Sequence, residues 1–478
     1  MPQFSPTPAE ALATAVATTR GRGGGCFLGV GDRPVFSPAD HAVLVLGPPR
    51  SGKTSSIVVP TVLGADGPVL AASTKRDVFE ATAMSRAIRG RVMVFDPSGE
   101  ASLPSGVERV GWSPVTNARS WDRAVLCADA MVGASRGDRG RGEATHWNER
   151  AAALLGPLIH AAAIGGAEMT DVVRAVNRRD VAEFLGVLAK LGSSGPLDIL
   201  TGIVETDPRE LSGIFSTASS VLAAYRTEGA RTSAALPPID YARFIEGADT
   251  CFILGSGEQQ RHLAPLIAGM IGDVRHAAYR RAAAGRGGPA VLLVLDELAN
   301  IAPLDDLPAL VAEGASQGVV TLACLQDLSQ AQQRWGRAAD GFLSLFGTKV
   351  VLPGIGDRRT LEGLSLLSGD GDVRTVSVSG RGRVRNSWTR GTRSERRVPP
   401  DVIANGPPGS AIVVTGADLR QITLAPAHTT EPFRRLLPPA RDAVVRATDQ
   451  SDRTAPEARP FGGRWVRQRA GRGRALER

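Results

Sequence analysis

The chain has 478 residues, of which 42% are hydrophobic and 5% aromatic, and its formal net charge is +8 at pH 7. This length and composition indicate a globular protein with two or three domains and ample material for a hydrophobic core. The four dispersed cysteines form no CxxC pair, which disfavours zinc sites and disulfides, and no run of about 18 apolar residues could span a bilayer.

The N-terminal segment has neither the basic start nor the apolar centre of a signal peptide, so we expect a cytoplasmic protein. Residues 1–24 end in GRGGG and are predicted to be a flexible lead-in. In residues 25–118, the runs AVLVLG, GPVLAAS and RVMVFDP are typical of strands, and DVFEATAMSRAI of a helix. This alternation predicts a parallel sheet flanked by helices, that is, the first half of an α/β domain.

The first predicted strand runs into GPPRSGKT, which matches G-x-x-x-x-G-K-[ST] in full. Backbone N–H groups of such a loop close on phosphates, and the helix start that follows adds its dipole. Lys53 would neutralise the β and γ oxygens, and Thr54 would place its hydroxyl on Mg²⁺. The alternative is a glycine turn that holds nothing. The predicted nucleotide-binding residues are Gly47, Pro48, Pro49, Arg50, Ser51, Gly52, Lys53 and Thr54.

Between residues 119 and 235 the pattern becomes helical throughout, which predicts an inserted all-α domain. Strand patterns return in residues 236–440, at DTCFILG, PAVLLVLDE, GVVTLACLQ, GTKVVLPG and SAIVVTG, and predict the second half of the nucleotide-binding domain. The stretch GRGRVRNSWTRGTRSERR is predicted to form a loop or loose hairpin. Residues 441–478 are polar and arginine-rich and are predicted to be a disordered tail.

Three side chains are expected at the carboxyl edge of this sheet, where nucleotide sites lie. Asp296 and Glu297 follow the buried run AVLLVL. Asp296 would hold Mg²⁺, directly or through water, and Glu297 would polarise the attacking water as general base. Gln326 follows the next strand and would bond the γ-phosphate or that water. The alternatives are an ordinary strand that ends in two acids, and a glutamine that caps a helix.

Positive charge is concentrated near the C-terminus. Residues 371–478 contain 21 arginines and 10 acidic residues, which gives them a net charge of +11. The net charge of the whole chain is +8, so residues 1–370 have a net charge of −3. Arginines could bind the phosphates of nucleic acid without reading its sequence. The other interpretation is a solvated basic tail, because only Trp388 and Trp465 offer tryptophan rings for stacking in this region.

Several motifs together resemble the coupling-protein ATPases of bacterial conjugation and type IV secretion. They are GPPRSGKT, LDELANIAPLDDLPALVAEGASQG and LACLQDLSQAQQRWG, with STKRDVFEATA, VMVFDPSGE and GIGDRRTLEGLS in the family's order. The resemblance implies a RecA-type P-loop NTPase fold with a parallel central sheet and an inserted all-α domain. It also implies that Lys53 binds phosphate and Thr54 binds the metal. Asp296 and Glu297 would be the acidic pair of the site, and Gln326 would be the sensor of the γ-phosphate.

The resemblance further implies that the chain hydrolyses ATP with Mg²⁺ in a homo-oligomeric ring of six subunits. Its partners would be single-stranded DNA with a bound relaxase, bound without sequence readout, and the components of a type IV secretion channel. The chain would act at the inner face of the cell membrane. Typical family members begin with transmembrane helices that are not found here, so a separate membrane-anchor partner is one expectation.

One departure from the family pattern concerns an arginine. Members usually have GRSRG where this chain has Gly314-Ala315-Ser316-Gln317-Gly318, so the arginine expected to reach a neighbouring subunit's nucleotide is missing there. Arg334, Arg358 and Arg359 are the candidate substitutes. The missing arginine keeps open a non-hydrolysing, nucleotide-dependent docking adaptor. A double-stranded DNA translocase of the chromosome-segregation type is the other alternative, and the large helical insert argues against it.

Overall fold

The computed structural model describes residues 14, 24–135, 143–255, 259–379 and 387–438. The predicted tail, residues 441–478, and nearly all of the predicted lead-in lie outside the described residues. In the described part of the chain, no helix combines the length and apolarity that crossing a bilayer requires.

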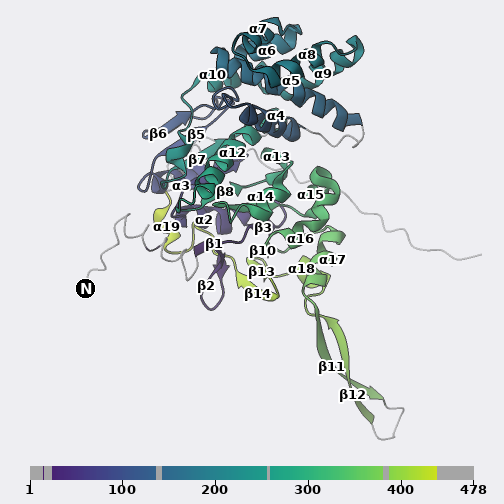
Figure 1. Cartoon of the computed structure of the whole chain (residues 1–478). Helices are drawn as coiled ribbons and strands as arrows, with labels where there is room; N and C mark the ends of the chain where they lie inside the picture. Colours follow the sequence, from purple (N-terminus) through teal and green to yellow (C-terminus); the bar gives the residue numbers. More distant parts are fainter. Residues whose placement is uncertain (1–13, 15–23, 136–142, 256–258, 380–386, 439–478) are drawn as a thin grey trace, which may run out of the picture. The chain divides into compact units, whose positions relative to one another are not determined.

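Twelve strands of the described residues form one mixed sheet (Figure 1). From one edge to the other they are β2 (Pro34–Pro38), β1 (Gly24–Val30), β14 (Asp418–Thr423), β13 (Ser410–Thr415), β10 (Thr348–Val351), β3 (Val43–Leu46), β9 (Val319–Leu325), β8 (Val291–Leu295), β4 (Val69–Ser73), β7 (Thr250–Leu254), β5 (Val92–Phe95) and β6 (Val107–Val110). The strands from β10 to β6 are parallel, as expected, and β13, β14, β1 and β2 extend the sheet in antiparallel fashion.

The sequence patterns predicted the strands of the parallel centre and β13, but they missed β1, β2, β6 and β14. The missed strands lie in the antiparallel extension or at an edge of the sheet. Glycine, proline and charged residues interrupt their apolar runs, as is usual where a strand is not covered on both faces. The central α/β architecture is confirmed.

Alternate residues of the parallel strands pack on opposite faces of the sheet. In β3, Val43 and Val45 join the core that includes helices α2 (Val59–Gly64) and α3 (Asp77–Arg86). Leu44 and Leu46 join the core on the other face, which includes α12 (Gln260–Ala283). Because both faces are covered, the strands are continuous apolar runs, and this is why they could be predicted from sequence.

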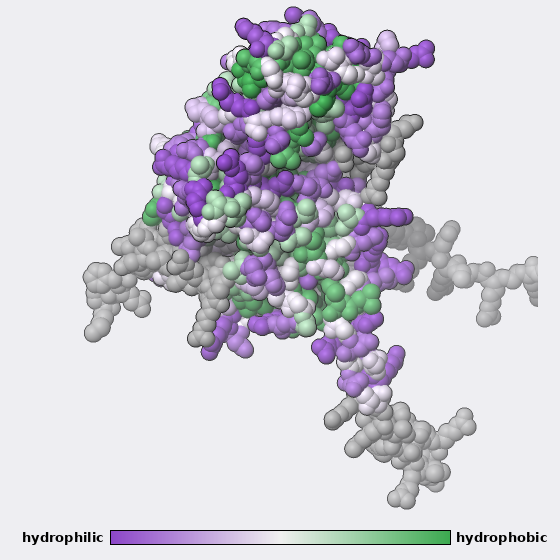
Figure 2. Space-filling model, viewed as in Figure 1, coloured by the Kyte–Doolittle hydropathy of each residue, from purple (hydrophilic) through white to green (hydrophobic). Residues whose placement is uncertain are grey.

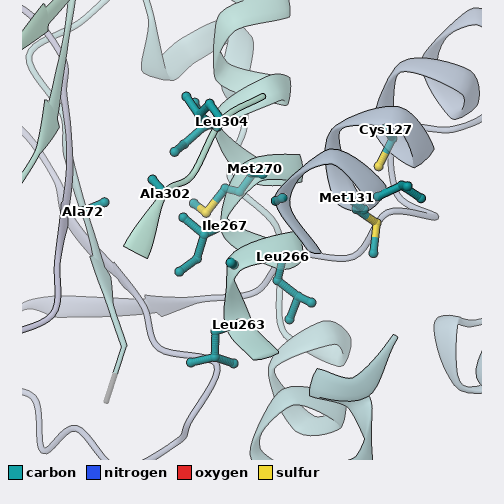
Figure 3. Packing of buried hydrophobic residues seen from close by; sticks show 14 of the residues in the cluster. Ala72, Cys127, Met131, Leu263, Leu266, Ile267, Met270, Ala302 and Leu304 are labelled. Carbon is teal, nitrogen blue, oxygen red and sulfur yellow. The ribbon is translucent and has the colours of Figure 1, made fainter. Parts of the chain in front are cut away.

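Helix α12 lies between the sheet and α4 (Trp121–Ser135), the first helix of the helical segment (Figure 3). Each fully buried Leu, Ile or Met side chain stabilises the fold by about 1.5–3 kcal/mol. The residues labelled in Figure 3 are Leu263, Leu266, Ile267 and Met270 of α12, Cys127 and Met131 of α4, Ala72 of β4, and Ala302 and Leu304. The hydrophobic core therefore continues from the sheet into the helical segment.

No strand occurs between residues 119 and 235 in the described part of the chain. The helices there are α4, α5 (Glu143–Gly165), α6 (Met169–Arg178), α7 (Ala182–Lys190), α8 (Ser194–Val204), α9 (Pro208–Val221), η3 (Ala223–Arg226) and α10 (Glu228–Ala235). Buried Asp273 of α12 accepts hydrogen bonds from Trp112, Asn117 and Arg123 around the entry to this segment. An inserted domain with these boundaries is still a proposal, because segment and sheet share one core and one compact unit.

The remaining helices lie before β7 or between and after the later strands. They are α11 (Tyr241–Phe244), α13 (Leu298–Ile301), α14 (Leu307–Glu313), α15 (Leu328–Trp335), η4 (Gly336–Gly341), α16 (Phe342–Leu345), α17 (Arg358–Leu367), α18 (Pro400–Ala404) and α19 (Phe433–Leu436). The predicted loop or loose hairpin, residues 380–397, contains β12 (Ser387–Arg396), which pairs with β11 (Asp370–Ser379) in a regular antiparallel ladder that forms a sheet of its own. Residues 380–386 between these strands lie outside the described residues.

Candidate nucleotide-binding site

The carboxyl ends of four parallel strands lie side by side, in the order β3, β9, β8 and β4. The register pairs Leu46 with Leu325, Leu295 with Ala323, and Ala72 with Leu295. The residues that follow these strands therefore meet at one edge of the sheet. This places GPPRSGKT, Gln326, the Asp296–Glu297 pair and the segment after Ser73 next to each other.

The GPPRSGKT loop turns tightly between β3 and the π-helical stretch η2 (Thr54–Val58). Gly52 has a φ of 96°, which glycine adopts readily, whereas Arg50 has a φ of 63°, a left-handed conformation that costs a non-glycine residue about 1–3 kcal/mol. Such strain is typical of functional loops. A Cβ on Gly47 would come within 2.9 Å of Leu352 Cβ and Ser51 Oγ, so the loop packs too closely there for a larger residue.

The Lys53 ammonium lies within this loop. It donates hydrogen bonds to the carbonyl oxygens of Gly47 and Pro48, the latter at 2.9 Å. Burial lowers the pKa of Lys53 below its ordinary value, and Asp296 and Glu297 partly offset this effect. The half-buried cation is thus held at the mouth of the loop, where it can meet a phosphate.

Asp296 follows β8 and is only 6% exposed. Thr54 Oγ1 donates to its Oδ2 at 3.1 Å, and Ser73 Oγ donates to the same oxygen at 3.4 Å. Burial raises the pKa of Asp296 above its ordinary value, Glu297 raises it further, and the Thr54 and Ser73 hydrogen bonds oppose the rise. The carboxylate thus lies beside the hydroxyl of the phosphate loop.

Glu297 is half-buried and adopts a left-handed backbone, with φ 68° and ψ 48°. Its Oε2 accepts a hydrogen bond from Thr74 Oγ1 at 2.9 Å. Two of the three non-glycine residues with positive φ in the described chain, Arg50 and Glu297, therefore belong to this one site.

A cavity of about 500 Å³ unites these groups. The predicted residues that line it are Pro49, Arg50, Ser51, Gly52, Lys53, Thr54, Asp296, Glu297 and Gln326. Gly47 and Pro48 do not line it but hold the Lys53 ammonium. Lining residues that the sequence did not predict include Asn300, Gln330, Ala427 and His428.

The cavity continues beyond Ser55 into a less polar part. Val59, Ala81, Ala427 and Leu437 line it there, and His428 is exposed at its rim. The chain after β14 reaches this place because Ala427 N donates to Ser55 O at 2.8 Å. Sequence reasoning missed this segment, since no motif marks it and only the fold brings it back to the phosphate loop.

The donors and acceptors fit a magnesium nucleotide. Thr54 and Asp296 offer hydroxyl and carboxylate oxygens, the ligands that Mg²⁺ prefers. The buried Ser51 Oγ has no hydrogen-bond partner among the residues that the structure describes, and it belongs to the loop expected to face phosphate oxygens. Lys53 supplies the positive charge. The residues present therefore fit both a phosphate chain and its metal.

The three candidate arginines differ in their surroundings. Arg334 Nη2 donates to Gly133 O at 2.7 Å and to Pro303 O at 3.0 Å, so it ties α15 to α4 within the subunit. Arg358 and Arg359 begin α17 and have side chains that are 88% and 61% exposed. Arg358 forms an ion pair with Glu362, and Arg359 forms one with Asp340. Because both pairs are at the surface, replacing them by contacts to another subunit would cost little free energy.

A sheet with β9 between β3 and β8, a phosphate loop after β3 and an acidic pair after β8 defines a RecA-type P-loop NTPase fold. The chain belongs to the family described as "Type IV secretory system Conjugative DNA transfer", whose model matches residues 10–399. This confirms the family predicted from the motifs, that of the conjugative coupling proteins.

Two curated relatives are conjugal transfer proteins TraG of Escherichia coli. They are 26% and 25% identical to this chain over 317 residues, which is 61% of this chain and 49% of each relative. The chain thus spans about half the length of the curated relatives it matches.

Solved structures of the bacterial conjugative coupling protein TrwB share the fold. The unbound monoclinic form of TrwBdeltaN70 has a TM-score of 0.64 at 20% identity, covering 86% of this chain and 91% of that one. TrwB with the ATP analogue ADPNP has a TM-score of 0.62 at 19% identity, covering 86% and 92%. TrwB with ADP and Mg²⁺ has a TM-score of 0.62 at 20% identity, covering 87% and 91%.

Proposed function

We propose that this chain hydrolyses ATP with Mg²⁺ and uses the energy to bring a DNA–relaxase substrate to a type IV secretion channel. The observation that carries the proposal is one cavity lined by Lys53, Thr54, Asp296, Glu297 and Gln326, at the edge where four parallel strands end. Family membership and the nucleotide-bound structures of TrwB support it.

Each residue has a distinct part in the proposed reaction. The loop N–H groups and Lys53 hold the terminal phosphates, and Thr54 and Asp296 hold the metal, which supplies positive charge against the phosphate oxygens. Glu297 accepts a proton from the attacking water, and the Gln326 amide bonds that water or the γ-phosphate. The less polar part of the cavity, beyond Ser55, holds the nucleobase.

The substrate would dock on the helical segment. The face drawn in Figure 2 has hydrophobic atoms gathered where Figure 1 places α6 to α8. Leu191, Ile199 and Val204 of this segment are 53%, 39% and 38% exposed. An exposed apolar patch of this kind is typical of a protein-binding surface. This supports recognition of a protein component, such as a relaxase on single-stranded DNA.

A ring of subunits, proposed as a hexamer, would complete each nucleotide site. We propose that Arg358 or Arg359, rather than Arg334, reaches the neighbouring subunit's phosphates. Both are exposed at the start of α17, and the preceding strand β10 ends at the same sheet edge as β3. The non-hydrolysing adaptor is the second candidate, because Ala315 occupies the place of the family's arginine.

ATP turnover is expected to rise more than linearly with protein concentration and to be stimulated by single-stranded DNA. Lys53→Ala should abolish it and weaken ATP binding by about 10-fold or more, because a charge-assisted contact to phosphate is lost. Lys190→Ala, which changes an exposed lysine at the end of α7, is the matched control and should behave as wild type. ATP binding without turnover at any protein concentration, with or without DNA, would exclude an ATP-hydrolysing motor and favour the non-hydrolysing docking adaptor.

Affinity for magnesium nucleotide should increase as pH rises above the ordinary aspartate pKa of about 3.9. The reason is that the buried Asp296 keeps its proton to higher pH and must release it to bind a cation. Because the pKa of Lys53 is lowered, affinity should fall again on the alkaline side.

Calorimetry in two buffers of different ionisation enthalpy would measure the proton released on binding. Asp296→Asn should abolish that release together with the acid limb of the affinity profile. An acid limb that survives in this variant would show that another group titrates.

A further inference from the structure

Glu297, the proposed general base, is bonded by Thr74, a residue to which the sequence analysis assigned no role. Thr74 Oγ1 donates to Glu297 Oε2 at 2.9 Å. The pairing of Ala72 with Leu295 explains the contact, because the residues after β4 then run beside those after β8. Ser73 accordingly bonds Asp296, and Thr74 bonds Glu297.

The direction of this hydrogen bond matters. The phosphate loop follows β3, on one side of β8, whereas Thr74 follows β4, on the other side. Asp296 receives its shortest hydrogen bond from Thr54 of the phosphate loop. Thr54 therefore bonds Asp296 from the phosphate-loop side of β8, whereas Thr74 bonds Glu297 from the β4 side, from which Ser73 also bonds Asp296.

The backbone does not account for this placement by itself. The left-handed conformation of Glu297 fixes only where its side chain starts, and the hydrogen bond to Thr74 fixes where the carboxylate ends. Loss of that bond would leave a half-buried carboxylate free to turn within a cavity that Lys53 and Gln326 also line.

We propose that Thr74 is a positioning residue that restrains Glu297 until the substrate engages. The hydrogen bond keeps the carboxylate away from the attacking water, and its release lets Glu297 act as base. This inference rests on the proposed function, since it assigns a regulator to the same reaction.

Further contacts lead from Thr74 toward the helical segment. Arg76, two residues later, donates to Ser102 O at 2.6 Å. Ser102 closes a turn whose N–H groups bond the buried Asp96. The turn packs on α10 so closely that a Cβ on Gly229 would come within 2.3 Å of Ser98 O. A partner that shifts α10 would therefore act on contacts that reach Arg76, two residues along the chain from Thr74.

Thr74→Val tests the restraint, with Thr74→Ser as the control that keeps the hydroxyl. A hydrogen bond to an ionised group corresponds to about a tenfold factor in an equilibrium. We therefore expect Thr74→Val to raise ATP turnover without DNA by about tenfold and to reduce the stimulation by DNA by a similar factor. Thr74→Ser should match wild type.

Turnover that falls or stays unchanged in Thr74→Val, while wild type hydrolyses ATP, would overturn the restraint and leave the proposed function intact. No turnover in either protein would overturn the proposed function. A double-mutant cycle of Thr74→Val with Glu297→Ala, measured by denaturant unfolding, reports on the contact without any activity, because alanine offers no acceptor to Thr74. Zero coupling in that cycle would also overturn the inference.

Discussion

Glu297→Gln is expected to bind ATP with nearly wild-type affinity and to hydrolyse it about 100-fold to 10,000-fold more slowly. Glutamine has the shape of glutamate but cannot accept a proton from the attacking water. The groups that hold phosphate and metal, Lys53, Thr54 and Asp296, are untouched by the change. Single-turnover measurements with labelled ATP, beside an equilibrium binding titration, would separate the two effects.

The matched control is Glu183→Gln, which removes the same charge from an exposed position in the first turn of α7. It should leave both binding and turnover unchanged. If Glu297→Gln kept more than a tenth of wild-type turnover, the general base would have to be another group. If it lost ATP binding, Glu297 would instead belong to the phosphate and metal contacts.

Arg86→Ala is expected to lower the free energy of unfolding by about 3–5 kcal/mol. The Arg86 side chain is 0% exposed. Its guanidinium bonds Thr250 Oγ1 at 2.7 Å, the carbonyl oxygens of Gly67 and Ala248 at 2.9 Å each, and that of Ala65. Burial lowers the pKa of Arg86 to about 9, so the group is still charged at neutral pH. Its removal leaves several buried acceptors without a donor.

The neighbouring Arg89→Ala is the comparison for this prediction. Arg89 bonds Ala65 O and Asp66 from a side chain that is 19% exposed, so we expect a loss of about 1 kcal/mol. Denaturant unfolding followed by circular dichroism measures both variants. Equal losses would mean that the carbonyl cluster around Arg86 finds water or other donors when the guanidinium is removed.

The Arg86 cluster also shows how the amino edge of the sheet is held. Some of its acceptors belong to the loop before β4, and the others lie at the start of β7. These two strands are neighbours in the sheet, but β4 precedes the helical segment in the chain and β7 follows it. Arg86 therefore joins parts of the chain that lie on either side of that segment. Sequence inspection gave no sign of this role, because buried arginines are rare and nothing in DVFEATAMSRAI distinguishes Arg86 from a surface residue.

The class of fold and most of the residues of the candidate site could be predicted from the sequence. The strands of the parallel centre are buried on both faces, so each is a continuous apolar run that can be recognised locally. GPPRSGKT is local too, because loop, lysine and hydroxyl are contiguous in the chain. Asp296, Glu297 and Gln326 could be placed at one edge because every parallel strand ends there.

Which side chains meet across that edge depends on the long-range packing of the chain. Thr74 and Glu297 are separated by 223 residues, and their contact depends on the pairing of β4 with β8. The sequence did not distinguish Arg334 from Arg358 and Arg359, and only the fold shows that Arg334 lies against Gly133 and Pro303. Strand neighbours and helix contacts are set by long-range packing, which a short motif does not encode. Burial and backbone turns, by contrast, produce patterns of residue types in the local sequence.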